Sequence, residues 1–209
     1  MTRPTSSTAI ANLALRHLKN APITSISPPD SDSKAAASCA AWYDQSRRHC
    51  LEDHPWNFAT KRVEIAAEND EPVFEYLKKY QVPSDFIRVG RLGESWYDPE
   101  RDYEIEGDYI ITDVTTPLKL VYVYDFENVS KFSSKFISCL AYKLAANMAY
   151  ELTGNASLKD GMEQLYRSEL TSAASVDGQN RPTRRIQKSK LADARQNLGR
   201  YRNWQSWET

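Results

Sequence analysis

The sequence has little glycine and little cysteine, and both shortages argue against whole classes of protein. Only seven of its 209 residues are glycine, and none forms the clustered loop whose backbone amides close around a phosphate. The three cysteines, Cys39, Cys50 and Cys139, are an odd number without short spacings. That pattern favours free thiols in a reducing compartment over a disulfide framework. Neither a glycine-loop nucleotide-binding fold nor a disulfide-stabilised fold is therefore expected.

Long apolar runs are also missing. No stretch approaches the roughly 20 apolar residues that would span a bilayer, and the first seven residues lack the apolar core of a secretory signal. We therefore expect no membrane association and a chain that is made in the cytoplasm. Hydrophobic residues still make up 41% of the sequence, which is enough to bury a core. One domain with appendages is the expected organisation.

Charge is distributed unevenly, although the net charge is only -1. Residues 176–209 carry eight of the 27 Lys and Arg but three of the 28 Asp and Glu, which gives this segment a net charge of +5 and residues 1–175 a net charge of -6. The basic segment has few apolar residues before Tyr201 and cannot build a core of its own. We therefore divide the chain into a body, residues 1–175, and a basic C-terminal arm, residues 176–209.

The sequence of the body predicts helices, then strands, then helices. Apolar residues at helical spacing, with capping residues, prolines or glycine at the ends, predict helices over about 5–20, 31–54, 131–153 and 157–174. Gly154 is expected to end the third of these helices, and Asp177 is expected to open the arm.

Between the second and third helices the pattern changes to short β-rich runs separated by prolines, which predicts a β-region over about 56–126 with a hairpin in residues 103–112. The expected fold is α+β, mainly α. It is a helical bundle with a small antiparallel β-region inserted between its N- and C-terminal helices, followed by an extended C-terminal arm.

The predicted helix 31–54 carries possible metal ligands, which are Cys39, His49, Cys50, Asp53 and His54. Cys50 and His54 share a helix face, but Cys39 lies roughly 16 Å from Cys50 along the axis. A structural zinc site needs four ligands, usually as two close pairs, and the sequence offers no second pair. Buried thiols and imidazoles at a helix end are the preferred interpretation, and neither a metal nor another cofactor is expected.

Catalytic motifs give no stronger signal. The sequence has no Gly-x-Ser-x-Gly turn, and its three histidines have no marked serine or cysteine partner. Glu52 and Asp53 could serve as the two carboxylates of a glycosidase, but adjacency in sequence does not set the separation across a sugar that this chemistry needs. A solvated helix end is the preferred interpretation, so no catalytic residue is assigned.

Two charged segments are candidates for contacts with macromolecules. An acidic run ends in Glu104, Glu106 and Asp108, where strand alternation places carboxylates on one face and apolar groups on the other. This surface is expected to repel nucleic acid. The basic arm has its own candidate contact residues, which are Arg181, Arg184, Arg185, Lys188, Arg200, Tyr201, Trp204 and Trp207. Composition leaves nucleic acid and an acidic protein surface equally open as partners of the arm.

Three segments together resemble a known family. Residues 48–59 read Arg-His-Cys-Leu-Glu-Asp-His-Pro-Trp-Asn-Phe-Ala, residues 80–89 read Tyr-Gln-Val-Pro-Ser-Asp-Phe-Ile-Arg-Val, and residues 136–154 contain Leu-Ala-Ala and Leu-Thr-Gly. In residues, order and spacing they are similar to the tail tubular protein A family of short-tailed bacteriophages. His-Pro-Trp-Asn-Phe-Ala and Pro-Ser-Asp-Phe-Ile-Arg are the most specific pieces. The resemblance covers about residues 5–175.

The resemblance implies a structural virion protein and not an enzyme. It implies a head-to-tail adaptor that assembles in the host cytoplasm and lies in the tail, at the head-tail junction. Copies of the chain, twelve in this family, would form a ring between the portal protein and a tail nozzle similar to tail tubular protein B. The arm would reach the portal or a neighbouring subunit. Trp56, Asn57 and Phe58 are expected to be structural and not to bind a ligand.

In such a ring the DNA channel continues through the adaptor. Double-stranded DNA would then pass without sequence-specific binding, and the acidic residues Glu104, Glu106 and Asp108 would suit the channel because attraction to phosphates would slow passage. Two alternatives stay open from the residues alone. One is a tail-associated peptidoglycan-cleaving enzyme that uses acidic residues, and the other is a DNA-binding module with a basic tail.

Overall fold

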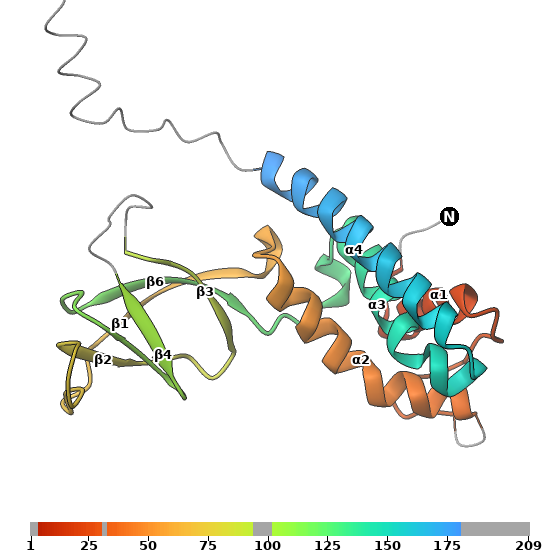
Figure 1. Cartoon of the computed structure of the whole chain (residues 1–209), viewed down its shortest axis with the longest axis horizontal. Coiled ribbons are helices and arrows are strands. Elements are labelled where there is room, and N and C mark those ends of the chain that lie inside the picture. Colours follow the sequence, from red (N-terminus) through yellow and green to blue (C-terminus); the bar gives the residue numbers. More distant parts are fainter. Residues whose placement is uncertain (1–3, 31–32, 94–101, 181–209) are drawn as a thin grey trace, which may run out of the picture. The chain divides into compact units, whose positions relative to one another are not determined.

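The computed structural model describes residues 4–30, 33–93 and 102–180 (Figure 1). Within these residues, four α-helices and two small antiparallel sheets of three strands form a mixed α+β fold that is mainly α. The predicted fold class is therefore confirmed. The candidate contact residues of the arm, Arg181 to Trp207, lie outside the described residues.

The helices begin and end where the local sequence provides caps. They are α1 (Ser7–His17), α2 (Lys34–Asp53), α3 (Ser134–Thr153) and α4 (Ala156–Gln179). The hydroxyls of Ser6, Ser33 and Ser133 each accept a hydrogen bond from a backbone N–H of the following first turn, because those N–H groups have no partner within the helix. Gly154 ends α3 with a φ of 66°, as predicted, since glycine adopts this left-handed conformation without steric cost.

Helix α3 is central to the bundle, where it packs against both α1 and α2 (Figure 1). Phe136, Leu140, Leu144 and Met148 recur at steps of four residues and are fully buried. Each buried side chain of this size stabilises the fold by about 1.5–3 kcal/mol relative to an exposed one. The apolar stripe predicted for this helix is thus the centre of the helical core.

Six strands follow α2 in the sequence. They are β1 (Thr60–Ile65), β2 (Lys78–Gln81), β3 (Phe86–Leu92), β4 (Tyr103–Glu106), β5 (Tyr109–Thr112) and β6 (Leu118–Tyr124). They form one sheet of order β1-β6-β3 and a second of order β2-β5-β4, and all strand pairs are antiparallel. Strands β4 and β5 are the predicted hairpin, with Gly107 at the turn and a φ of 59°.

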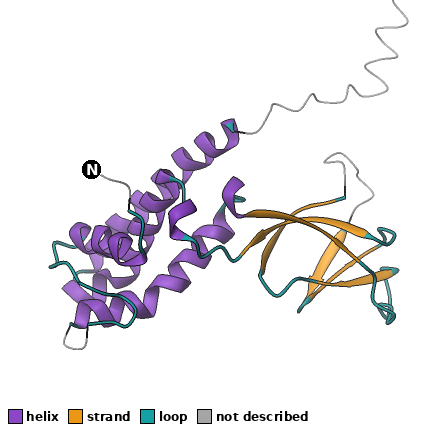
Figure 2. Ribbon diagram, turned by 180° about the vertical axis from the view of Figure 1, so that it is seen from behind, coloured by secondary structure: helices purple, strands orange, loops and turns teal. Residues whose placement is uncertain are grey.

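The helices and strands form separate groups in Figure 2, and each group has a hydrophobic core. The helical core also takes in Trp56, Val123 and Phe132 from the connecting segments and β6. The core of the β-region is small and combines side chains from both sheets, namely Tyr80, Val89, Leu92, Ile110, Leu118, Leu120 and Tyr122. The two sheets therefore pack on each other as a small sandwich.

Helix α4 is longer than the sequence predicts. A helix ending at residue 174 and an arm opening at Asp177 were expected, but α4 continues through Gln179 and Asp177 is only 8% exposed. Both expectations are therefore wrong. Asp-Gly is a local turn signal, and contacts with residues far away in the sequence override it, as described next.

Candidate functional site

The segment after α2 carries the most specific part of the family resemblance, and it is built into the helical core. Trp56 is fully buried, and its indole Nε1 donates a hydrogen bond of 2.7 Å to the carbonyl oxygen of Cys50. The indole also meets the ring of Phe136 edge-on at 5.1 Å between centroids. Phe58 packs on Phe136 at 5.0 Å as well. The structural role predicted for these aromatic residues is confirmed.

His54 and Asn57, from the same segment, hold the end of α4. The backbone N–H of Asn57 donates to Asp177 Oδ2 at 3.1 Å, and the Asn57 side-chain Nδ2 donates to the carbonyl oxygen of Asp177 at 2.7 Å. His54 Nε2 lies 3.3 Å from Asp177 Oδ2. We call His54, Asn57 and Asp177 the helix-end anchor. It satisfies the polar groups of Asp177, which explains why α4 does not stop at residue 174.

A second polar group lies next to the anchor, one turn earlier on α2. The Tyr166 hydroxyl donates a short hydrogen bond to the Asp53 carboxylate, and His49 Nε2 lies 3.4 Å from the same carboxylate. Burial raises the pKa of Tyr166, and its electrostatic contacts with Cys50 and Asp53 raise it further. Tyr166 is therefore a neutral hydrogen-bond donor at physiological pH, and the Asp53 carboxylate accepts its hydrogen bond.

The second resembling segment ties the β-region to the bundle. Arg88 on β3 donates to the carbonyl oxygen of Glu52 at the end of α2, at 2.6 Å. Asp85 accepts hydrogen bonds from Lys61 at 2.6 Å and from the Tyr122 hydroxyl at 2.9 Å. Burial alone would raise the pKa of Asp85, but these hydrogen bonds outweigh it and hold that pKa below its ordinary value.

Arg47 adds a buried ion pair that the sequence analysis missed. Its side chain is 2% exposed and donates to the carboxylate of Asp125 and to the carbonyl oxygen of Phe126, at 3.0 Å to the latter. Asp125 follows β6, so this contact joins α2 to the strand that leaves the β-region. No local pattern could have found it, because the two residues are 78 positions apart.

Of the site residues predicted from sequence, Glu104, Glu106 and Asp108 are the ones that the structure describes. All three are exposed, and Glu104 and Glu106 lie on β4. Burial does not alternate along β4, whose four residues are all exposed, and its apolar residues Tyr103 and Ile105 are 39% and 48% exposed.

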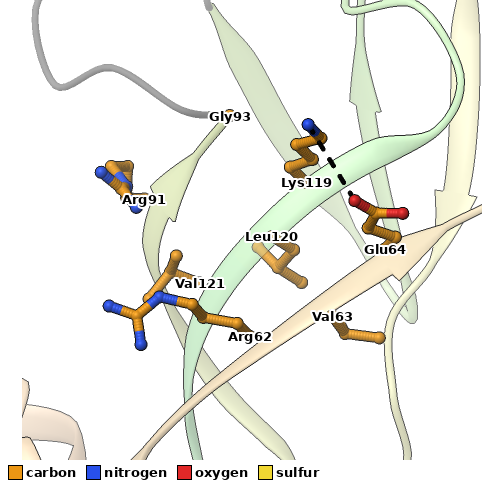
Figure 3. A pocket seen from close by; sticks show the side chains of 8 residues that line it. All are labelled: Arg62, Val63, Glu64, Arg91, Gly93, Lys119, Leu120 and Val121. Carbon is orange, nitrogen blue, oxygen red and sulfur yellow. Dashed lines mark ion pairs between the residues drawn. The ribbon is translucent and has the colours of Figure 1, made fainter.

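A basic cluster on the other sheet was also missed. Arg62 on β1, Arg91 on β3 and Lys119 on β6 surround one pocket, together with Glu64, which pairs with Lys119 at 4.0 Å (Figure 3). These residues are far apart in sequence and become neighbours through the strand order β1-β6-β3. The cluster combines three cationic groups with one carboxylate.

The described residues offer little to catalysis or metal binding. No group of three or more His, Cys, Asp or Glu side chains among them could hold a metal ion. Cys39, Cys50 and Cys139 are buried free thiols, as predicted. Burial raises the pKa of Cys39 to about 11 and that of Cys139 to about 12, and it also raises the pKa of Cys50. The thiols are thus protonated and unreactive at neutral pH.

None of the described helices is both long and apolar enough to cross a membrane.

The comparisons with known proteins add no relative. No model of a known protein family matches the chain, and no curated protein is significantly similar to it.

Proposed function

We propose that this chain is a structural virion protein, a head-to-tail adaptor whose copies form a ring between the portal and the tail nozzle and continue the DNA channel. The ring is expected to contain twelve copies, as in the tail tubular protein A family, to lie at the head-tail junction, and to assemble in the host cytoplasm. Double-stranded DNA would pass through it without sequence-specific binding, and neither a membrane nor an enzymatic reaction would be involved.

The observation that best supports this proposal is that the three resembling segments pack on one another. Trp56 of the first segment contacts Phe136 of the third, and Arg88 of the second donates to the carbonyl oxygen of Glu52 in the first. The three segments lie apart in the sequence and meet in the fold. Here they connect the helical core to the β-region, so they act as one structural unit.

The helix-end anchor gives the arm a defined starting point. Asp177 is fixed to His54 and Asn57, and the basic residues that begin at Arg181 follow four positions later. We propose that its arginines, Lys188 and its terminal aromatic residues contact the portal or a neighbouring subunit.

Glu104, Glu106 and Asp108 are exposed, which a channel lining requires. A contact between subunits requires the same exposure. Exposure fits a channel lining, a subunit contact and a solvated strand face alike.

Removal of the arm tests the proposal. Truncation after Asn180 keeps the helix-end anchor, so the shortened chain is expected to fold as the full chain does and to lose binding to the portal protein of the same phage. Truncation after Ala174 is the matched comparison, because it also removes Asp177 and is expected to lower stability. Binding of the full chain should weaken as salt increases, since screening reduces the attraction of the basic arm.

Two results would contradict the proposal. If the chain truncated after Asn180 binds portal as tightly as the full chain, the arm is not the portal contact. If the full chain degrades peptidoglycan and Glu52→Gln abolishes that activity, the chain is an enzyme. Trypsin gives an independent readout, because cleavage at Arg184 or Arg185 in the free chain should be blocked in the portal complex.

A further inference from the structure

The loop between β1 and β2, residues 66–77, holds the most exposed large apolar side chains of the described residues. Val73 is 96%, Phe74 is 77% and Leu77 is 66% exposed. Single exposed apolar residues are normal on a protein surface. Three of them within five positions of one loop form the kind of concentrated apolar surface that marks a binding site for a partner.

Polar contacts hold this loop against the second sheet. The backbone N–H of Leu77 donates to Asp113 Oδ1 at 2.9 Å, just beyond the end of β5. The Lys78 ammonium at the start of β2 pairs with the Glu71 carboxylate in the loop at 2.8 Å. The loop therefore has a defined position on the sheet, and its apolar side chains are exposed in that position.

The tip of the loop is a γ-turn. The Tyr76 N–H donates to the carbonyl oxygen of Phe74 at 2.9 Å, and Glu75 between them has a φ of 73°. A hydrogen bond across a single residue of positive φ belongs to the rare, strained form of this turn. Strain at a residue other than glycine is found mostly at binding and catalytic segments. The turn is thus a second, independent sign that this loop contacts a partner.

The surroundings of the loop are strongly acidic. Residues 66–81 and 102–113, which include the loop and the three strands of the second sheet, carry nine carboxylates and two lysines, a net charge of -7. Both lysines already pair with a carboxylate, since Lys79 lies 3.6 Å from Asp70. Partial burial raises the pKa of Tyr76, and four nearby carboxylates raise it further, which are Glu104, Glu75, Asp102 and Asp113. We call these four carboxylates, together with Val73, Phe74 and Leu77, the acidic apolar patch.

The C-terminal arm has the complementary composition. Residues 181–209 carry eight Lys and Arg but only two Asp and Glu, a net charge of +6, and they include Tyr201, Trp204 and Trp207. Arginine and large aromatic residues together are typical of segments that anchor an interface. Fully extended, these 29 residues would span at most about 100 Å, which is long enough to reach a neighbouring copy. The arm therefore matches the patch in charge and in apolar character.

We propose that the acidic apolar patch of one copy binds the basic arm of the next copy, so that the arms link the subunits around the ring. The aromatic residues of the arm would cover Val73, Phe74 and Leu77, and its arginines would pair with the surrounding carboxylates. The assignment rests on the proposed ring and, of the two partners open to the arm, it selects the neighbouring subunit.

This contact uses two different surfaces of each copy. Every subunit gives its arm to one neighbour and its patch to the other, which is the head-to-tail type of interface that closes into a ring. Glu104 then lies in a contact between subunits and not along the DNA channel that the sequence suggested.

Two charge-reversal variants of the full chain test this contact. Glu75→Lys/Glu104→Lys changes the patch, and Arg184→Glu/Arg185→Glu changes the arm. Each variant alone is expected to raise the concentration for half-assembly by about tenfold, because like charges then replace opposite ones. An equimolar mixture should assemble again, since in an alternating ring each arm meets a patch of opposite charge. Sedimentation velocity, with and without portal, measures the assembly.

Phe74→Ser tests the apolar half of the contact without a change in charge. Phe74 is largely exposed in the single chain, so the melting temperature of the free chain should not change. Assembly should weaken by about tenfold, as expected when an aromatic side chain is removed from the centre of an interface. A Phe74→Ser variant that assembles as the unmodified chain does would overturn the proposal.

The matched control for the patch is Glu52→Lys/Asp160→Lys, which makes the same change in charge at two exposed carboxylates of the helices and should assemble normally. If the unmodified chain forms rings and the patch variant forms them equally well, the arm does not bind this patch, while the adaptor function stands. A mixture that does not recover would show that the contact does not join copies.

Two further results also count against the proposal. If the arm variant forms rings but no longer binds portal, the partner of the arm is the portal and not the neighbouring patch. If the unmodified chain forms no ring either alone or with portal, the proposed function fails and this contact fails with it.

Discussion

The helical bundle and the β-region differ in how completely each buries its apolar residues. The helical core contains 28 buried residues from all four helices and the connecting segments, whereas the β-region core contains seven. Of the eight exposed large apolar side chains in the described part of the chain, three lie on the helices and five belong to the β-region, namely Val73, Phe74, Leu77, Tyr103 and Ile105. The bundle thus buries its apolar residues more completely than the β-region does.

The contact that joins the two regions should show the largest effect on stability. Arg47→Ala removes the buried partner of the Asp125 carboxylate, which is itself 15% exposed, and breaking a buried ion pair in this way costs about 3–5 kcal/mol. Chemical denaturation measures the loss. Arg48→Ala is the control, because Arg48 binds the same carboxylate at 2.7 Å from a 65% exposed position, where an ion pair contributes little. Equal losses in the free energy of unfolding for the two variants would contradict the larger contribution assigned to the buried Arg47.

Within the bundle, the centre of α3 should be the most sensitive position. Leu140→Ala removes a fully buried side chain and is expected to cost about 2–5 kcal/mol in the free energy of unfolding. Leu165→Ala on α4 is the matched control, because Leu165 is 45% exposed and should lose well under half as much. If the Leu140→Ala variant melts at the same temperature as the unmodified chain, the stripe is not core.

The helix-end anchor should have an intermediate effect that is confined to α4. Asp177→Ala removes the carboxylate that accepts from the Asn57 N–H, and losing such a hydrogen bond at a largely buried position costs about 1–3 kcal/mol. Hydrogen exchange of the last turns of α4 should accelerate, while that of α3 should not change. Asp160→Ala, at an exposed position of the same helix, serves as control. Unchanged exchange near Asp177 would show that the anchor does not hold the helix.

Alkaline pH should weaken the bundle gradually. Burial raises the pKa of Cys39 to about 11 and the pKa of Cys139 to about 12, from an ordinary value of 9.0. Between those values the native thiols keep protons that the unfolded chain has already released, so stability is full below about pH 9 and falls as the pH rises. Denaturation at a series of pH values measures this decline. A free energy of unfolding that stays constant from pH 8 to 11 would contradict the buried state of the thiols.

The smallest effect on stability is expected at the edge of the β-region. Ile105→Ser changes a side chain that is 48% exposed, so the free energy of unfolding should move by about 0.5 kcal/mol or less. A variant that is destabilised as much as Leu140→Ala would remove the contrast between the two regions.

Local signals in the sequence predicted the helices, the hairpin and the structural role of the aromatic residues. Gly154 and Trp56 belong to this group, because a left-handed cap and an aromatic residue after a helix-ending proline are recognisable from a few neighbours. Asp177 was misjudged because its partners, Asn57 and His54, are about 120 positions away. The basic cluster was not predicted for the same reason, since only the strand order brings Arg62, Arg91 and Lys119 together.

The central claim is that this chain forms the ring that joins portal to tail nozzle. Electron microscopy of negatively stained full chain, alone and mixed with the portal protein of the same phage, tests it most directly. We expect closed rings that stack coaxially on the portal, and we expect them to be lost when the chain is truncated after Asn180. A chain that stays monomeric in the presence of portal, with no added density on the portal, would contradict the claim.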